Sequence, residues 1–441
     1  MMRKNSYITI VAVLLSFSVK AQYGIEWIDF NQSYYKLQIA STDFYRVTQA
    51  ELTAAGFPAA SVPASRVQLF RKGSEVAINV NANQDGTLNY LEFFGEAISG
   101  VEDSPLYELG DQPHSLYNLF SDTAAYFLTY KLGAESGKRI AFSSDQDASG
   151  LTAEPFHYEE TSILYTSDYA TGIRFGTKSA FSLSKYDLGE GWTGALQGKG
   201  VFTDHDFVLT NRVAGEVPIC DFVLSGRNSL AHNAAVSAGP STSSLTSIGS
   251  TQFTGWGSTG DSFSISETSI GGAGELTLRV LTEGFDGATD FLSVAYMRVR
   301  YAQDLVAPPT ENSIFTLGDP SDTKAYLQIS ATTPSAVSIY DIEDPTTLLR
   351  IATANFSDRV DAVIPNPISG HKVLAVTNPS SVPLIKQVSL VQPSLTGKDY
   401  LIITHPSLRA SGDPVMDVKN YRESSVGGNH SVLITEIQEL F

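Results

Sequence analysis

Cysteine is nearly absent from this 441-residue chain, in which Cys220 is the single thiol. One cysteine excludes an internal disulfide framework and a cysteine-rich zinc site. Charged residues are also few, at 17% of the chain against roughly 25% in typical soluble domains. Cations are the scarcer sign, because 29 Lys and Arg stand against 47 Asp and Glu and leave a net charge of −18. Binders of nucleic acids or anionic membranes need clustered cations, so we expect no nucleic-acid partner.

No apolar stretch reaches the roughly 18 residues that a membrane-spanning helix needs. The stretch 7–19 is apolar, follows Arg3 and Lys4, and leads to a small-x-small site that ends at Ala21. This arrangement predicts a secretory signal peptide over residues 1–21. We therefore expect a protein secreted across the inner membrane into the periplasm, onto the cell surface or into the medium.

Hydrophobic residues make up 42% of the chain, which is enough for several cores, and its length corresponds to about three domains. Ser, Thr and Gly take the place of charges and favour short strands and turns over helices. From Tyr35 to Ile39 apolar and polar residues alternate as in a half-buried strand. Thr48 and Glu51 have the spacing of a helix capping box, and Asp85-Gly86 has that of a hairpin turn. We predict an N-terminal β-rich domain over residues 22–150.

The middle of the chain also shows strand patterns. Residues 151–217 alternate weakly and are interpreted as a β-rich connecting region. Clearer alternation over 218–307 predicts a β-sandwich or jelly-roll domain. Within it, the stretch 237–274 is rich in Ser, Thr and Gly, but interleaved aromatic residues favour surface strands over a linker. After the linker Pro308-Pro309, residues 310–397 form a predicted small β domain.

Residues 398–441 change character. The runs 400–403 and 432–434 are continuously apolar, as in strands buried on both faces of a parallel sheet. Between them, Asp413-Pro414 is a helix start with aspartate as N-cap and proline at the first helical position. This is a strand, helix, strand pattern of βαβ length. Since one helix covers one sheet face, we expect an incomplete α/β domain with an uncovered apolar face.

The residues from Asn81 to Glu92 match the spacing of an EF-hand calcium loop, with Asn83 and Asp85 at ligand positions. A calcium loop requires an anionic first ligand and flanking helices, whereas Asn81 is neutral and both flanks have strand patterns. A hairpin turn is the better interpretation. We therefore predict no cofactor, and calcium at this turn stays open as the alternative.

Two further motifs have plain structural explanations. Residues 255–260 spell the Gly-x-Gly-x-x-Gly dinucleotide fingerprint, which works only between a strand and a helix. The following residues 261–265 alternate as a strand, so we interpret these glycines as turn residues. The triplet Asp204-His205-Asp206 is interpreted as a solvated turn.

Nucleophiles and metal ligands are sparse. Cys220 lies between apolar residues in a strand pattern, which predicts a buried core residue rather than a nucleophile. The seven histidines are dispersed, without an i,i+4 pair or an HExxH motif: His114, His157, His205, His232, His371, His405 and His430. His405 follows a predicted parallel strand at the edge where α/β active sites lie, but no partner for it is evident. We assign no catalytic, cofactor-binding or metal-ligating residue.

Several blocks resemble the N-terminal β-rich region of gingipain-type cysteine peptidases. They are residues 67–76 (Val-Gln-Leu-Phe-Arg-Lys-Gly-Ser-Glu-Val), 90–95 (Tyr-Leu-Glu-Phe-Phe-Gly) and 121–129 (Ser-Asp-Thr-Ala-Ala-Tyr-Phe-Leu-Thr). Residues 399–404 (Asp-Tyr-Leu-Ile-Ile-Thr) resemble the opening of the catalytic domain of that family. Within the family, the sortase-like proteins of type IX secretion are the most similar.

The resemblance implies a caspase-like α/β catalytic domain that cleaves polypeptides with a His–Cys dyad, in which the histidine precedes a glycine. No histidine here is followed by glycine, and Cys220 precedes the α/β segment. We therefore expect the N-terminal, non-catalytic portion of a secreted endopeptidase or sortase, truncated before the dyad and inactive alone. Type IX secretion components are the expected partners. A non-catalytic secreted β-sandwich binding or export-accessory module is the alternative, and a surface adhesin-like protein is a third.

Overall fold

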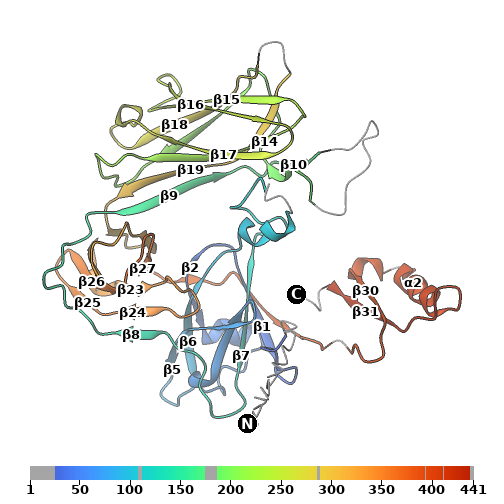
Figure 1. Cartoon of the computed structure of the whole chain (residues 1–441). Coiled ribbons are helices and arrows are strands. Elements are labelled where there is room, and N and C mark those ends of the chain that lie inside the picture. The colour runs from blue at the N-terminus through green and yellow to red at the C-terminus, as the bar shows by residue number, and fades with distance from the viewer. Residues whose placement is uncertain are drawn as a thin grey trace, which may run out of the picture. The chain divides into compact units, whose positions relative to one another are not determined.

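The structure, a computed structural model, describes residues 25–107, 112–173, 186–285, 289–392, 394–410 and 412–437. The predicted signal peptide lies outside the described residues. The chain divides into two compact units, one of residues 34–71 and 75–388, and the other of 1–33, 72–74 and 389–441. Strands far outnumber helices among the described residues (Figure 1). This confirms the mainly-β fold class. None of the described helices has the length and apolar character needed to cross a bilayer.

The larger unit begins with a domain of two sheets around one core. The first sheet has the order β29 (Leu384–Val388), β1 (Tyr34–Ile39), β7 (Ala124–Tyr130), β3 (Val67–Arg71) and β4 (Ser74–Val76). The second has the order β28 (Ser380–Ser381), β2 (Asp43–Thr48), β6 (Leu88–Gly95) and β5 (Asn79–Ala82). The predicted alternation places Leu37 and Ile39 in this core, where neither is exposed. The 3-10 turn η1 (Ala64–Arg66) lies against β5, and a second 3-10 turn, η2 (Gly100–Leu106), follows β6.

The predicted capping box and hairpin are both confirmed. Helix α1 (Gln49–Ala54) begins where Thr48 Oγ1 accepts a hydrogen bond from the Glu51 amide, while Glu51 Oε2 accepts from the Thr48 amide at 2.7 Å. Between β5 and β6, Asp85 Oδ1 accepts from the Thr87 amide at 3.0 Å, and Gly86 has a φ of +82°. A left-handed φ of this kind costs glycine little, which explains the residue at that position.

The C-terminal boundary of the predicted small domain, residues 310–397, differs in the structure. Strand β29 runs antiparallel to β1, with Tyr34 opposite Val388, and β28 runs parallel to β2. Between them Val382 is 9% exposed and belongs to the core of the first domain. The local pattern of residues 380–388 indicates strands correctly, but a strand pattern does not identify its partner.

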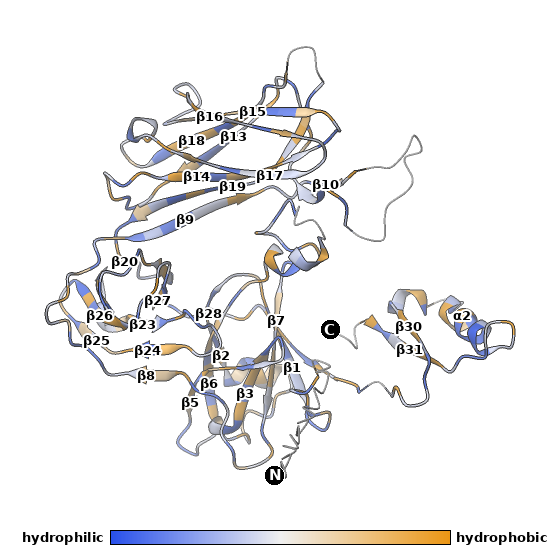
Figure 2. Ribbon diagram, viewed as in Figure 1, coloured by the Kyte–Doolittle hydropathy of each residue, from blue (hydrophilic) through white to orange (hydrophobic). Residues whose placement is uncertain are grey.

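The middle of the chain forms the predicted β-sandwich. One of its layers is part of a ten-stranded sheet, whose path runs β17 (Ser258–Ser264), β14 (Ile219–Gly226), β19 (Phe291–Gln303), β9 (His157–Leu164), β21 (Ser313–Thr316), β27 (Lys372–Val376), β23 (Ser338–Asp341), β24 (Leu349–Ile351) and β8 (Ala141–Ser143), with β12 (Gln197–Gly198) beside β19. The other layer has the order β13 (Phe202–Val208), β18 (Glu275–Thr282), β15 (Ala231–Gly239) and β16 (Thr246–Thr254). Figure 2 shows hydrophobic and hydrophilic residues alternating along β18, whose Leu276, Leu278 and Val280 fill the core between the layers.

Residues 151–217, predicted as a connecting region, are integral to this sandwich because β9, β12 and β13 all come from it. A short hairpin of β10 (Asp168–Thr171) and β11 (Glu190–Thr193) also belongs to this stretch. The 3-10 turn η3 (Glu267–Ser269) precedes β18. The stretch 237–274, interpreted as surface strands, contains β16 and β17 as expected.

The small β domain packs the other half of the ten-stranded sheet against a four-stranded sheet. That sheet has the order β20 (Val306–Ala307), β22 (Lys324–Ala331), β26 (Arg359–Pro365) and β25 (Thr353–Asn355), and the turn η4 (Pro334–Ala336) follows β22. Leu327, Ile339 and Ile364 are among the fully buried residues of its core. Only one residue pair, Tyr158 with Thr316, joins β9 to β21 where the sandwich meets this domain.

The last segment is the predicted βαβ arrangement. Strands β30 (Tyr400–Thr404) and β31 (Val432–Glu436) are parallel, with the turn η5 (Pro406–Leu408) and helix α2 (Pro414–Glu423) between them. Asp413 caps α2 by accepting a hydrogen bond from the Met416 amide at 3.2 Å. The expected uncovered apolar face is confirmed for the described residues, because Leu401 and Ile403 are 49% and 54% exposed. One helix covers one face of the pair, and these two side chains alternate onto the other face.

Candidate functional site

Cys220 is a core residue, as predicted. It lies on β14, is 1% exposed, and its sulfur is 4.0 Å from the carbonyl oxygen of Asp221. Burial, followed by the charge of Asp221, raises the pKa of the thiol to about 12. A thiolate nucleophile requires a lowered pKa and access to substrate, and this position provides neither.

The triplet 204–206 is not a solvated turn but the middle of strand β13, so that interpretation is wrong. Asp204 pairs with Arg279 on the neighbouring strand β18, with Oδ1 2.6 Å from Nε. Asp206 accepts a hydrogen bond from the Thr277 hydroxyl. Cross-strand partners of this kind stabilise a polar strand face. The sequence of β13 alone does not indicate these partners, because they lie on another strand. His205 turns to the other face, where its Nδ1 is 2.7 Å from the Tyr165 hydroxyl.

The glycine motif and the calcium-like loop both occupy turns. Gly255, with a φ of +84°, begins the corner between β16 and β17, and a strand rather than a helix follows it, as predicted. In the calcium-like segment, the Glu92 carboxylate is bound by Arg46 and by Asn79 Nδ2 and lies on β6 beyond the Asp85 turn. Among the residues that the structure describes, no three His, Cys, Asp or Glu side chains are grouped to hold a metal ion.

The histidines have separate environments. His405 follows β30 as predicted, and its Nδ1 accepts a hydrogen bond from the Ser407 amide, so that it caps η5. His430 Nδ1 lies 3.4 Å from Asp399 Oδ2 at the start of the two parallel strands. His371 Nε2 lies 3.0 Å from Asp341 Oδ1. None of these contacts involves Cys220, so the described residues do not form a sulfur–imidazole pair.

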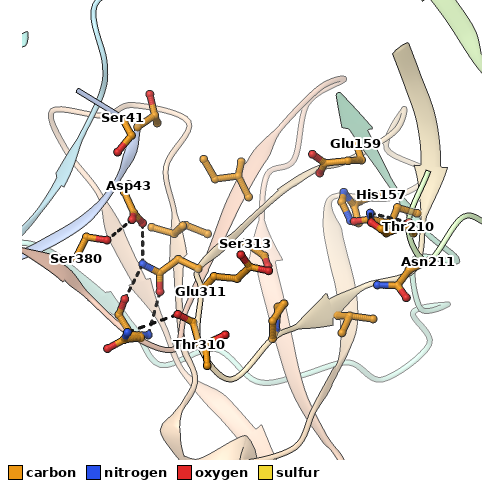
Figure 3. Close-up of a pocket in the computed structure, with 18 residues that line it drawn as sticks. Ser41, Asp43, His157, Glu159, Thr210, Asn211, Thr310, Glu311, Ser313 and Ser380 are labelled. Atoms are coloured by element: carbon orange, nitrogen blue, oxygen red, sulfur yellow. Dashed lines mark hydrogen bonds between the residues drawn. The ribbon is translucent and has the colours of Figure 1, made fainter. Parts of the chain in front are cut away.

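The sequence did not indicate a polar cavity of about 590 Å³ within the larger unit (Figure 3). Its walls come from segments far apart in sequence, the loop 41–43, strand β9, the turn 210–211 and the segment 306–314. On one side Asp43 accepts hydrogen bonds from Asn312 Nδ2 at 2.7 Å and from the Ser380 hydroxyl. No local motif marks these residues, because only the folded chain brings them together.

Comparison with known proteins gives a structural relative but no sequence relative. No protein-family model matches the chain, and no curated protein matches it. Its fold is similar to that of dimeric latent PorU from Porphyromonas gingivalis, with a TM-score of 0.63 and 16% identity over 92% of this chain and 37% of PorU. A xylanase CBM36 domain from the hindgut metagenome of Trinervitermes trinervoides (12% identity, 32% of this chain, 96% of that domain) matches at a TM-score of 0.20. An adhesin domain of Lys-gingipain from Porphyromonas gingivalis (11% identity, 32% of this chain, 90% of that domain) matches at 0.18.

The PorU match confirms the expected resemblance at the level of the fold. The chain spans 37% of the length of the PorU structure, so the comparison concerns part of that protein. At 16% identity it identifies the architecture, and the two domain-sized matches are too weak to add to it.

Proposed function

We propose that this chain is the β-rich, non-catalytic N-terminal portion of a gingipain-type cysteine endopeptidase or type IX secretion sortase. The observation that carries the proposal is the fold shared with PorU over 92% of this chain. The βαβ segment gives further support, because parallel sheets of α/β domains have both faces covered. The exposed Leu401 and Ile403 lie on the face against which further elements of such a domain would pack.

In this proposal the β domains form the scaffold, and the His–Cys dyad belongs to the α/β domain that begins near residue 398. The imidazole of that dyad would take the thiol proton, and the thiolate would attack a peptide carbonyl. Cys220 has no part in this chemistry, since it is buried and its pKa is raised to about 12. Polypeptide substrates and type IX secretion components are therefore proposed for the complete enzyme, and residues 1–21 are proposed as its secretion signal.

Reading the gene beyond codon 441 tests the proposal directly. We expect a continuation, in frame or after a frameshift, that encodes a histidine followed by glycine and a later cysteine. A continuation without these residues would contradict the proposal and favour a secreted β-sandwich binding or export-accessory module. As a biochemical check, the purified 441-residue chain should show no thiol-dependent cleavage of fluorogenic peptides.

A further inference from the structure

The cavity in the larger unit is lined by charges of one sign. Three of its lining residues are acidic, Asp43, Glu159 and Glu311, and they come from three separate segments. Neither Lys nor Arg is among the described residues that line it. Its volume of about 590 Å³ falls in the range of roughly 300–1,000 Å³ that is usual for ligand sites. The Asp43 carboxylate already accepts hydrogen bonds from Asn312 and Ser380. An acidic group of the cavity that lacks a partner must therefore be another residue.

Glu159 is an acidic residue of the cavity whose partly buried carboxyl group is unpaired within the part of the chain that the structure describes. Among the described residues its carboxyl group has neither a hydrogen bond nor an ion pair, although it is partly buried on β9. Burial, with a smaller contribution from Glu160, raises its pKa to about 7. The adjacent Glu160 points to the opposite face of the strand and pairs with Arg298 at 3.3 Å.

His157 lies two residues earlier on the same face of β9. It is 1% exposed and lines the cavity. Gln303 Nε2 donates to the Thr210 carbonyl at 2.8 Å, which makes Gln303 Oε1 the acceptor for His157 Nε2 at 3.0 Å. Nδ1 is itself buried, so the ring offers no exposed acceptor to a ligand in the cavity. Figure 3 shows His157 beside Thr210 at the wall of the cavity. Burial lowers the pKa of the His157 ring, so it does not place a positive charge beside Glu159.

Part of the remaining wall is apolar. Val306, Pro308, Ile314 and Leu374 line the cavity together with the acidic groups. A ligand that fits both kinds of wall has an aliphatic stem and a cationic, hydrogen-bond-donating head, which is the build of a Lys or Arg side chain.

We propose that this cavity binds an alkylammonium or alkylguanidinium group, such as the side chain of a lysine or arginine presented by a polypeptide. Glu159 pairs with the cationic head, and the four apolar residues contact the stem. The site is independent of the proposed peptidase relationship, since it lies wholly within residues 34–388, and either can fail without the other.

Calorimetric titration of the full chain with butylguanidinium and with its neutral counterpart butylurea tests the proposal. We expect butylguanidinium to bind and butylurea to bind at least tenfold more weakly. Glu159→Gln should weaken butylguanidinium at least tenfold, whereas Glu160→Gln, the matched change on the other face of β9, should leave it within twofold. Equal binding of the two compounds, or equal effects of the two substitutions, would overturn the proposal.

The pH dependence provides a readout that a structural role of Glu159 would not produce. The titratable groups around this carboxyl are Glu160, Tyr301 and His157, with Asp43 and Glu311 on the other walls. Because the guanidinium stays charged, its affinity should rise about tenfold from pH 6 to pH 8 as Glu159 ionises, and this rise should be absent in Glu159→Gln. A flat profile in the wild type would contradict the assignment.

A second titration, with peptides, distinguishes a polypeptide ligand from a free amine or guanidine. Acetyl-Gly-Arg-Gly-amide and its citrulline counterpart replace butylguanidinium and butylurea in the same titration. Binding of the arginine peptide alone supports a polypeptide ligand, and binding of butylguanidinium but not the peptide supports a free amine or guanidine. If neither cation binds, the proposal is wrong.

Discussion

His232 Nδ1 lies 2.6 Å from Asp290 Oδ1, and neither side chain is exposed to solvent. The other ring nitrogen lies 2.9 Å from the Gly255 carbonyl oxygen, and Asp290 Oδ2 accepts a hydrogen bond from the Asn233 amide at 3.0 Å. These contacts join strand β15, the corner between β16 and β17, and the residue preceding β19. A single buried pair thus connects three segments of the sandwich.

Replacing Asp290 with alanine should lower the free energy of unfolding by about 3–5 kcal/mol, because the buried imidazole and the Asn233 amide then lose their acceptor. Urea unfolding at pH 7 measures the change. Glu135→Gln removes an exposed ion pair with Lys131 and serves as the control, with an expected change below about 1 kcal/mol. A loss below that limit for Asp290→Ala would contradict the role of the pair.

His114 makes stability depend on pH in the acid range. Its side chain is 2% exposed, lies against the rings of Tyr117 and Tyr296, and neither ring nitrogen has a partner among the described residues. Burial lowers its pKa to about 4, below the value of roughly 6.5 in an unfolded chain. The unfolded state therefore binds the proton more readily, and stability falls as pH drops from about 6.5 toward 4.

The substitution His114→Phe should remove this acid sensitivity. From the size of the shift, the variant should gain up to about 3 kcal/mol relative to the wild type between pH 7 and pH 4. Urea unfolding of both proteins at several pH values measures the difference. Parallel pH profiles would show that His114 is not the titrating group.

Cys220 should be unreactive in the folded protein. Its burial and raised pKa predict no alkylation by iodoacetamide at pH 8 in the native chain and complete alkylation in urea. Mass spectrometry of the intact protein measures both. Rapid alkylation of the native chain, or peptide cleavage that disappears in Cys220→Ala, would contradict the assignment of this residue to the core.

The return of the chain to the first domain can be tested at Val382. This side chain is buried in the core formed with β1 and β2, whereas Val391 is 52% exposed. Val382→Asp should therefore cost about 2 kcal/mol or more and speed hydrogen exchange in β1 and β2, since it buries an unpaired charge. Val391→Asp is the matched control and should change neither quantity. Unaltered exchange in β1 and β2 after Val382→Asp would argue against this packing.

Local patterns predicted what depends on neighbours in sequence. The spacing of Thr48 and Glu51 predicted the start of α1, Asp85-Gly86 predicted the hairpin, and Asp413-Pro414 predicted the start of α2. Each feature is formed by hydrogen bonds or backbone dihedral angles within a few residues. The same holds for the assignment of residues 255–260 to a turn, because the strand pattern that follows excludes a helix there.

Patterns that depend on distant partners were misread. The polar triplet 204–206 suggested a turn because its stabilising contacts, Arg279 and Thr277, are more than 70 residues away. The domain boundary expected at residue 397 missed that residues 380–388 pair with β1 and β2. Hydrophobicity specifies which residues favour burial, but the elements that cover them are a property of the whole fold.

The sequence by itself determined the β-rich class, the sandwich, the βαβ segment and the buried position of Cys220, since periodicity and turn chemistry act over short stretches of chain. The tertiary structure alone decided that residues 380–388 pair with β1 and β2, that β9 joins two domains in one sheet, and that Asp43, Glu159 and Glu311 line one cavity. Strand pairing satisfies backbone hydrogen bonds that any strand can offer, so the choice of partner rests on packing between residues hundreds of positions apart.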